Sequence, residues 1–364
     1  MKKNILVVDD SALMRRVICD IINSDNNFQA TDTCRDGLEA YEKLKTQTYD
    51  GVLLDVNMPR MDGLELLERL QKEHIHANVI MVSTLTAKDA EVTLMALERG
   101  ALDFITKPTN IVEAKGEKFK KTLLRVLSAV PSAKTYSTRH TAGRGSVERN
   151  LSAAPMDSRP IGKVKRLPVT GSKRLVALAC STGGPKALQE IIPMLDSRMD
   201  APVVLVQHMP SGFTHSMAER LDEISRVSVK EAEDGDVLEK GHVYIAPGGK
   251  HLEIHRQPDG SHRVVLSNMP AIGGLRPCAN ITYDSLSDSG FDEIVCVVLT
   301  GMGADGTNGI LSLCQHKPVY VIAQDAKSCV VYGMPKSIVE AGIADEIVPL
   351  HEVAESIIKK VGVK

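Results

Sequence analysis

One segment near the middle of the chain lacks hydrophobic periodicity, and it limits the fold more than any other feature. Residues 128–170 hold only 14 apolar residues among 43 and are rich in Ser, Thr, Gly and Pro. A structureless loop of this length is improbable inside one compact domain. The sequence therefore predicts two domains, 1–127 and 172–364, joined by a basic flexible linker over 128–171. The length of 364 residues agrees, since domains average about 150 residues.

The linker is the most unbalanced part of the chain in charge. It holds eight Lys and Arg against two Asp and Glu, whereas the whole chain has 44 basic and 46 acidic residues. A nearly neutral chain has no general attraction to nucleic acid or anionic lipid. With five Phe, seven Tyr and no Trp, stacking on single-stranded nucleic acid is not expected either. We interpret the linker as a solvated spacer rather than as a tail that binds polyanions.

Apolar runs and cysteines indicate the compartment. The longest apolar runs, such as 294–299, are far shorter than the roughly 18 residues of a membrane span, and no signal peptide is visible. The seven cysteines are odd in number and form no CxxC pair, which favours a reducing environment and no zinc site. We expect a cytoplasmic monomer that neither binds nucleic acid nor inserts into a membrane.

The first part of the chain alternates short apolar runs with stretches of helical periodicity. This alternation continues from residue 4 to about residue 127 and is typical of a parallel sheet covered by helices. Ser11 is a candidate cap for the first helix. The sequence predicts a doubly wound α/β domain with five strands, at 4–8, 28–33, 51–55, 78–83 and 102–105.

Polar residues stand at the carboxyl ends of these strands, where a doubly wound sheet binds its ligands. Asp9 and Asp10 follow the first strand and Asp55 ends the third; Ser83 ends the fourth, and Lys107 follows the fifth. Converging carboxylates repel one another unless a cation such as Mg²⁺ neutralises them. A carboxylate beside Mg²⁺ and a lysine can accept a phosphoryl group. Each Asp alone would be interpreted as a cap, so the prediction depends on the whole set.

This arrangement resembles the receiver domain of response regulators. The resemblance implies a flavodoxin-like fold, phosphorylation at Asp55 and a requirement for Mg²⁺. It also implies Mg²⁺ ligands at Asp9, Asp10, Asp55 and, through its backbone carbonyl, Asn57, with switch residues at Ser83 and Lys107. Because a receiver has no output of its own, the second domain is expected to supply one.

The second domain also shows the alternation of a doubly wound α/β fold. Apolar strands are predicted at 174–180, 202–207 and 294–299, each followed by a helical pattern. Residues 227–266 hold shorter strands and Gly/Pro turns, which indicates an antiparallel edge.

Three candidate catalytic residues follow these three strands. Ser181 begins a Gly-rich turn into a helix, His208 follows the second strand, and Asp305 lies in a Gly-rich loop after the third. Alone, the first turn would favour anion binding, and His208 or Asp305 a structural role. Together they are a nucleophile, a base and an orienting carboxylate. Cys180 is a rival nucleophile, but its side chain should face the opposite way from Ser181 and pack in the core.

The second domain resembles the catalytic domain of the chemotaxis protein-glutamate methylesterases. The matching stretches are STGGP (181–185), VQHMPSGFT (206–214), IAPGGKHL (245–252), LTGMGADG (299–306), AQDAKSCVVYGMP (323–335) and EAGIADEIVPL (340–350). The resemblance implies a triad of Ser181, His208 and Asp305, with Thr182 and Met302 shaping the oxyanion site. One stretch departs from the family pattern: Cys278 and Asn280 stand where Ser and Asp are expected. If this stretch contacts the receptor helix, we expect the departure to bear on substrate preference rather than on the chemistry.

The two resemblances together imply a phosphorylation-activated hydrolase. It would demethylate γ-glutamyl methyl esters, and deamidate glutamines, on methyl-accepting chemoreceptors through an acyl-enzyme, without a cofactor for hydrolysis. A chemotaxis histidine kinase would be the phosphodonor. Two alternatives remain open at this point. One is a response regulator whose second domain binds a partner or DNA without catalysis, and the other is a general esterase or peptidase.

Overall fold

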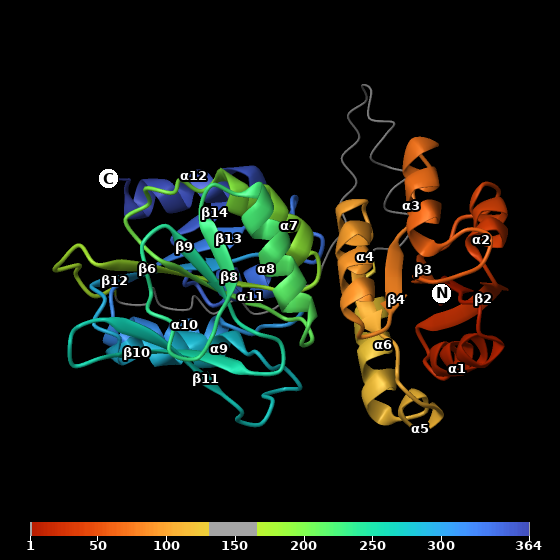
Figure 1. Cartoon of the computed structure of the whole chain (residues 1–364), viewed down its shortest axis with the longest axis horizontal. Coiled ribbons are helices and arrows are strands. Elements are labelled where there is room, and N and C mark those ends of the chain that lie inside the picture. Colours follow the sequence, from red (N-terminus) through yellow and green to blue (C-terminus); the bar gives the residue numbers. More distant parts are fainter. Residues whose placement is uncertain (1, 131–165, 364) are drawn as a thin grey trace, which may run out of the picture. The chain divides into compact units, whose positions relative to one another are not determined.

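The computed structural model describes residues 2–130 and 166–363, which belong to two compact units, Met1–Ile161 and Gly162–Lys364 (Figure 1). Each unit has its own sheet and core and is described by itself. The predicted linker, 128–171, falls mostly outside the described residues. Among the described residues, no helix is both long and apolar enough to cross a membrane.

The first unit is a five-stranded parallel sheet in the order β2-β1-β3-β4-β5. Its strands, each overlapping a predicted one, are β1 (Lys3–Val8), β2 (Phe28–Cys34), β3 (Gly51–Asp55), β4 (Val79–Ser83) and β5 (Asp103–Thr106). Its helices are α1 (Ala12–Asn23), α2 (Gly37–Leu44), α3 (Gly63–Lys72), α4 (Ala87–Glu98), α5 (Ile111–Ala114) and α6 (Glu117–Ala129). The predicted doubly wound, flavodoxin-like fold is confirmed.

Local sequence explains these elements. The central strands β1 and β3 are apolar runs because both of their faces are buried. Ser11 caps α1 by accepting a hydrogen bond from Met14 N, and the helix buries Val17, Ile18, Ile21 and Ile22. Helices α1 and α6 pack together on one face of the sheet. On the other face, α3 packs between α2 and α4. The strand order reverses between β1 and β3, so the ligand crevice of such a sheet lies at their carboxyl ends.

The second unit is a seven-stranded sheet in the order β14-β13-β12-β6-β7-β9-β8, with every pair parallel. The strands are β6 (Arg174–Cys180), β7 (Val203–Gln207), β8 (Ser228–Glu231), β9 (His242–Ile245), β12 (Glu293–Val298), β13 (Val319–Gln324) and β14 (Glu346–Val348). The expected antiparallel pair is present, but as a separate two-stranded sheet of β10 (His251–Arg256) and β11 (His262–Ser267). The edge of the main sheet itself, β8 and β9, is parallel.

Helices cover both faces of this sheet. They are α7 (Gly184–Ile191), α8 (Phe213–Ile224), α9 (Ala279–Ser285), α10 (Thr307–His316), α11 (Met334–Glu340) and α12 (Leu350–Val361), with short 3-10 helices η2 (Ile192–Met194) and η3 (Leu286–Asp288). Helix α7 packs with α8 and α12, whereas α10 packs with α9 and α11 (Figure 1). Tyr283 of α9 is fully buried, and its hydroxyl donates to the carbonyl of Ala177 in β6 at 3.3 Å. Helix α9 is therefore anchored on the centre of the sheet.

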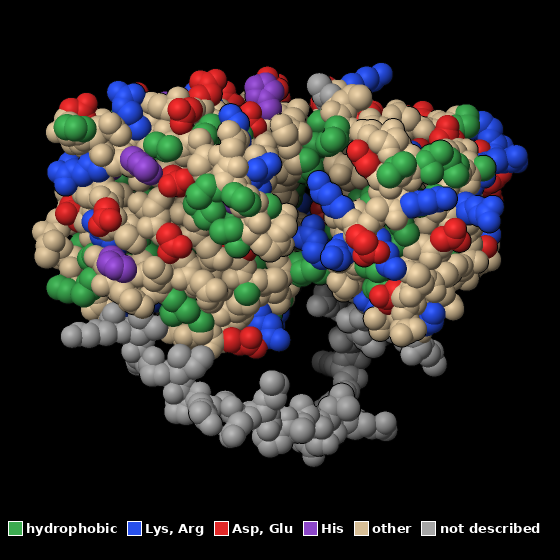
Figure 2. Space-filling model, turned by 90° about the horizontal axis from the view of Figure 1, so that it is seen from below, with side chains coloured by type: hydrophobic (Ala, Val, Ile, Leu, Met, Phe, Trp, Pro, Cys, Tyr) green, Lys and Arg blue, Asp and Glu red, His purple; other side chains and the backbone are tan. Residues whose placement is uncertain are grey.

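The strand order of the second unit reverses between β6 and β12. From β6 the chain builds β7, β8 and β9 toward one edge, and β12, β13 and β14 then extend the opposite edge. The crevice of a doubly wound sheet forms at such a reversal, beyond the carboxyl ends of the strands. On the face shown in Figure 2, basic and acidic side chains of the described residues are interspersed, in keeping with the balanced charge of the chain.

Candidate active site and acidic site

Three carboxylates meet at the carboxyl ends of β1 and β3. Asp9 and Asp10 follow β1 and Asp55 ends β3, and one oxygen from each lies within 4.8 Å of the others. Lys107, after β5, places its ammonium 2.6 Å from Asp55 Oδ2 and 2.9 Å from Asp9 Oδ2. Burial raises the pKa of Asp55 to about 6, because the lysine offsets only part of the loss of hydration. Three carboxylates beside one ammonium group leave a net negative charge, which a divalent cation can balance.

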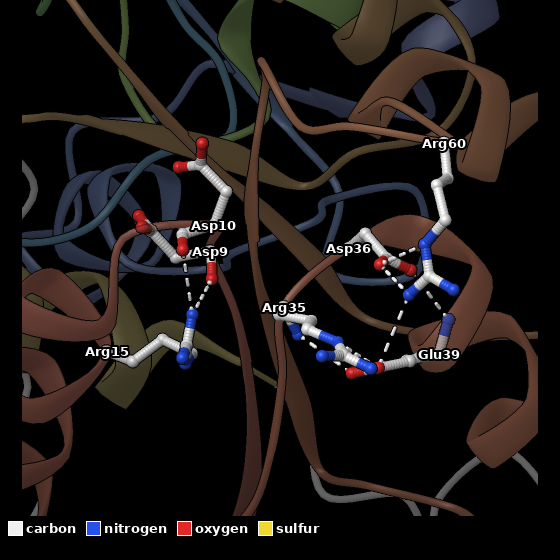
Figure 3. Close-up of polar contacts among 7 residues, drawn as sticks. All are labelled: Asp9, Asp10, Arg15, Arg35, Asp36, Glu39 and Arg60. Carbon is white, nitrogen blue, oxygen red and sulfur yellow. Dashed lines mark hydrogen bonds and ion pairs between the residues drawn. The ribbon is translucent and has the colours of Figure 1, made fainter.

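The turn that carries Asp9 and Asp10 is held through its backbone. Figure 3 shows the Arg15 guanidinium of α1 donating to the carbonyl oxygens of Asp9 and Asp10, at 2.6 and 3.0 Å. Ser11 N donates to Asp9 Oδ1 at 2.9 Å. The arginine therefore orders the turn without pairing with the two carboxylates.

The loop after β3 is tied to the start of α2. Arg60 adopts a left-handed backbone conformation, with φ of 67°, and its guanidinium pairs with the buried Asp36, which caps α2 (Figure 3). Gly37 N donates to Met61 O at 3.0 Å in the same contact. Sequence reasoning missed Arg60 and Asp36, because a charged pair between two loops leaves no periodic signal. The pair fixes the loop that also carries Asn57.

Asn57 and Ser83 both bond toward α4. Asn57 Nδ2 donates to Asp89 Oδ1 at 2.9 Å. The buried Ser83 hydroxyl accepts from Thr93 Oγ1 at 2.8 Å and lies 3.4 Å from the carbonyl of Asp89. Lys107 N donates to Ser83 O at 2.6 Å, which joins the ends of β4 and β5. The structure thus brings all the predicted residues of the acidic site to one edge of the sheet, with Ser83 bonded to the α4 side.

In the second unit, Ser181 and His208 follow residues that face each other in neighbouring strands. Cys180 of β6 pairs with Gln207 of β7, and each candidate residue comes directly afterwards. Ser181 is buried, and three hydrogen bonds fix its backbone. They join Ser181 N to Thr300 O at 3.0 Å, Gly184 N to Ser181 O at 2.7 Å, and Gln207 Nε2 to Ser181 O at 3.1 Å.

Close contacts require glycine at several positions where the chain turns around Ser181, among them 183, 184 and 301. Gly183 has φ of 78°, and a Cβ there would lie 2.6 Å from Val330 Cβ. A Cβ on Gly301 would lie 2.4 Å from Met334 Sδ and 2.9 Å from Ser181 Cβ. The loop after β12 therefore approaches the serine more closely than any side chain at position 301 would permit.

His208 and Asp305 form a buried pair. His208 Nε2 lies 2.8 Å from Asp305 Oδ2, with the two side chains 6% and 5% exposed. Burial alone would raise the pKa of Asp305, but the hydrogen bond and charge of His208 lead the effects that lower it to about 2. Because Asp305 is ionised, Nε2 carries the proton. His208 Nδ1 is buried without a hydrogen-bond partner among the described residues, and this is the nitrogen left for proton exchange.

The remaining candidates line the same turn. Thr182 is buried and its carbonyl accepts from Thr300 Oγ1 at 2.9 Å, while Met302 is half-buried in the loop after β12. Cys180 instead bonds Gln207 through its thiol, at 3.0 Å to Oε1, and burial raises its pKa far above neutrality. The thiol therefore stays protonated within the core.

Sequence reasoning missed the residues that support this turn. Thr300 N donates to the fully buried Gln324 Oε1 at 2.8 Å, and Thr300 Oγ1 accepts from Val331 N at 3.0 Å. Thr300, Gln207 and Gln324 follow or end apolar strands. A polar residue at the carboxyl end of a buried strand was the signal that could have identified them.

The fold and these two sites define a two-part response regulator: one unit with an acidic phosphoacceptor-type site, the other with a serine-hydrolase-type site. Comparison with known families agrees, since residues 5–115 match the response regulator receiver domain and residues 176–357 match the CheB methylesterase family. The chain belongs to the CheB methylesterase family.

Relatives and a solved structure extend the comparison over the chain. A protein-glutamate methylesterase/protein-glutamine glutaminase of Halalkalibacterium halodurans is 40% identical, over 98% of this chain and 97% of that protein. The Bacillus subtilis protein of the same name is 41% identical, over 97% of each chain. The crystal structure of the Thermotoga maritima CheB methylesterase catalytic domain matches 53% of this chain and all of that one, with 43% identity and a TM-score of 0.50.

Proposed function

We propose that this chain is a phosphorylation-activated protein-glutamate methylesterase that also deamidates glutamine side chains, acting on methyl-accepting chemoreceptors. The buried His208–Asp305 pair at 2.8 Å, next to a serine on the neighbouring strand end, is the observation that carries the proposal. Family membership and full-length relatives of that name support it.

Ser181, His208 and Asp305 have distinct roles in the proposed reaction. Ser181 Oγ attacks the γ-glutamyl ester carbonyl while His208 Nδ1 takes its proton. The imidazolium returns that proton to the methoxy group, and methanol leaves the acyl-enzyme. Water then attacks, its proton passes through His208 to Ser181, and the glutamyl carboxylate is released. An amide substrate follows the same steps with ammonia as the first product. Asp305 stays ionised and holds the Nε2–H tautomer.

The developing oxyanion needs donors at the turn. We assign this role to the backbone at Thr182 and to the loop at Met302, which both lie beside Ser181. The close approach of Gly301 to Ser181 supports the assignment, because it brings this loop against the nucleophile. No cofactor is needed for these steps.

The receiver unit would accept the signal at Asp55, from a chemotaxis histidine kinase. Asp9, Asp10, Asp55 and the carbonyl of Asn57 would hold Mg²⁺, and the three carboxylate oxygens within 4.8 Å of one another fit that ion. An Mg²⁺ ion held by these residues would supply the positive charge that offsets the carboxylates and the phosphoryl oxygens. Lys107 would pair with the new phosphoryl group, and Ser83 would turn from α4 to bond it.

The unpaired state of the cysteines supports a cytoplasmic location. All seven cysteines are free thiols, as a reducing compartment requires. We accordingly place the enzyme in the cytoplasm, where it would meet the cytoplasmic parts of its receptors.

Methanol release from methylated receptors tests the proposal. The wild-type chain should release methanol and lower the mass of receptor peptides by one CH₂ per methylated site. Ser181→Ala should release no methanol, yet it should still become phosphorylated at Asp55. Ser197→Ala, which changes an exposed serine, should behave as wild type. A Ser181→Ala chain that still releases methanol would exclude the serine mechanism. Absence of any release by the wild type, with labelling of Ser181 by a fluorophosphonate, would instead indicate another ester as substrate.

A further inference from the structure

The carboxylate of Asp305 is held by three successive residues at the start of α9. Cys278 Sγ lies 3.1 Å from Oδ1, Asn280 N donates to Oδ1 at 3.1 Å, and Ala279 N donates to Oδ2 at 2.7 Å. Oδ2 is also the oxygen that faces His208. The positions that depart from the family pattern thus lie against the carboxylate that pairs with His208.

The side chain of Asn280 bonds the backbone that follows Asp305. Its Oδ1 accepts from Gly306 N at 3.1 Å and from Gly309 N at 2.7 Å, in the first turn of α10. Gly306 N donates to Asp305 Oδ1 as well, at 3.0 Å. Because one N–H serves both oxygens, the amide oxygen of Asn280 and the carboxylate of Asp305 are close neighbours.

Uncharged groups lie close to the pair on this side. Among the described residues, the titratable groups that interact with Asp305 include Cys278 before α9 and Tyr283 within α9, and Cys180 and Cys296 lie near Tyr283. Burial raises the pKa of Cys278 to about 12 and raises the pKa values of Tyr283 and Cys180 as well, so all three stay protonated. The Cys278 thiol is therefore a donor to Asp305.

We propose that Cys278 and Asn280 are positioning residues of the esterase: they hold the Asp305 carboxylate toward His208, and the neutral amide of Asn280 sets the pH range of the reaction. The inference rests on the proposed esterase function. A carboxylate at position 280 would stabilise the imidazolium form of His208. Fewer molecules would then carry the unprotonated Nδ1 that accepts the proton of Ser181.

Asn280→Asp in the full-length chain tests the charge, because aspartate keeps the acceptor for Gly306 and Gly309. We expect the acid limb of the kcat/KM profile to move up by about one pH unit, so that activity at pH 6 falls about tenfold and activity at pH 9 stays within about threefold. Asn308→Asp makes the same change at an exposed position of α10 and should leave the profile unchanged. Coincident profiles for Asn280→Asp and the wild type would overturn the inference.

Cys278 variants test the hydrogen bond. Cys278→Ala should lower kcat about tenfold with KM within twofold, and Cys278→Ser, which restores a donor, should recover at least half of the wild-type kcat. A Cys278→Ala chain with wild-type kcat, or a Cys278→Ser chain as impaired as Cys278→Ala, would refute the role. Far-UV circular dichroism of each variant shows whether the fold is retained.

A second readout separates this inference from the proposed function. Labelling of Ser181 by a fluorophosphonate depends on His208 and Asp305 but not on a receptor. Its rate should show the same shift of the acid limb in Asn280→Asp. If the wild type labels but releases no methanol, the proposed substrate is wrong and the labelling profile still decides the role of Asn280.

Discussion

Replacing Gly301 by alanine should show how closely the loop after β12 fits against Ser181. The new Cβ would lie 2.4 Å from Met334 Sδ, 2.9 Å from Ser181 Cβ and 3.1 Å from Ser181 N. Ordinary carbon contacts need about 3.5–4.0 Å, so the loop or the serine must move by roughly 1 Å. Met334 is fully buried, and backbone hydrogen bonds fix Ser181, so neither can move freely.

The magnitude follows from that displacement. Overpacking of a core site costs typically about 1–3 kcal/mol of unfolding free energy. A misplacement of about 1 Å at a reacting group can cost on the order of 100-fold in rate. We expect Gly301→Ala to lose stability and reaction rate by these amounts. Urea unfolding, followed by circular dichroism, measures the stability, and methanol release from methylated receptor measures the rate.

Gly303→Ala, in the same loop, is the matched control. Gly303 has φ of 86°, but no atom lies within 4 Å of its would-be Cβ, so alanine adds backbone strain without a clash. It should lose about 1 kcal/mol of stability and keep most of its activity. If Gly301→Ala is as active as Gly303→Ala, the loop does not seat Ser181 and the steric reasoning fails.

Three further predictions concern charged groups. Asp305→Asn should lower kcat by about 10⁴, as expected when the orienting carboxylate of a Ser-His-Asp triad is lost. The pKa of Asp305 is lowered to about 2 in the fold, so its ionised form should add on the order of 2 kcal/mol to the free energy of unfolding of the wild type above pH 4. In urea unfolding, the difference in stability between the wild type and Asp305→Asn should therefore shrink as the pH falls toward 2. The stability contributed by Asp55 should depend on pH in the opposite direction, because its pKa is raised to about 6. Without Mg²⁺, the wild type should lose stability as the pH rises from 4 to 6, whereas Asp55→Asn should not lose it. Calorimetric scans over this pH range measure the effect, and an equal dependence of stability on pH in both proteins would contradict it. Glu293→Ala removes a buried carboxylate that pairs with Arg174 at 2.9 Å and with Lys360 at 2.8 Å. The change should lower the free energy of unfolding by about 1–3 kcal/mol, measured in urea, and leave kcat per folded molecule unchanged. A lower kcat would show that this end of β12 influences the site.

Much of the fold and of both sites was predictable because the signals are local. Strands β6, β7 and β12 are apolar runs that end in or lead to polar residues, and the carboxyl ends of parallel strands share one edge of a sheet. That rule alone placed Ser181, His208 and Asp305 together, although they span more than 120 residues of sequence.

Contacts between loops were not predictable. Arg60 pairs with Asp36, and Asn280 bonds both Asp305 and the start of α10, without any periodic pattern in the chain. The departure at Cys278 and Asn280 was visible in the sequence, but the contacts of these two residues were not. The structure places both residues against the carboxylate of Asp305.

The sequence by itself predicted the five strands of the first unit, three strands of the second and the polar residues that follow them, because hydrophobic periodicity and turn chemistry act over a few neighbouring residues. Only the tertiary structure decided that β12 returns to lie beside β6, that His208 faces Asp305 through Nε2, and that Asn280 stands next to the same carboxylate. These relations join residues about 25 or more positions apart, and they depend on the order of strands and the packing of helices, which no local pattern encodes.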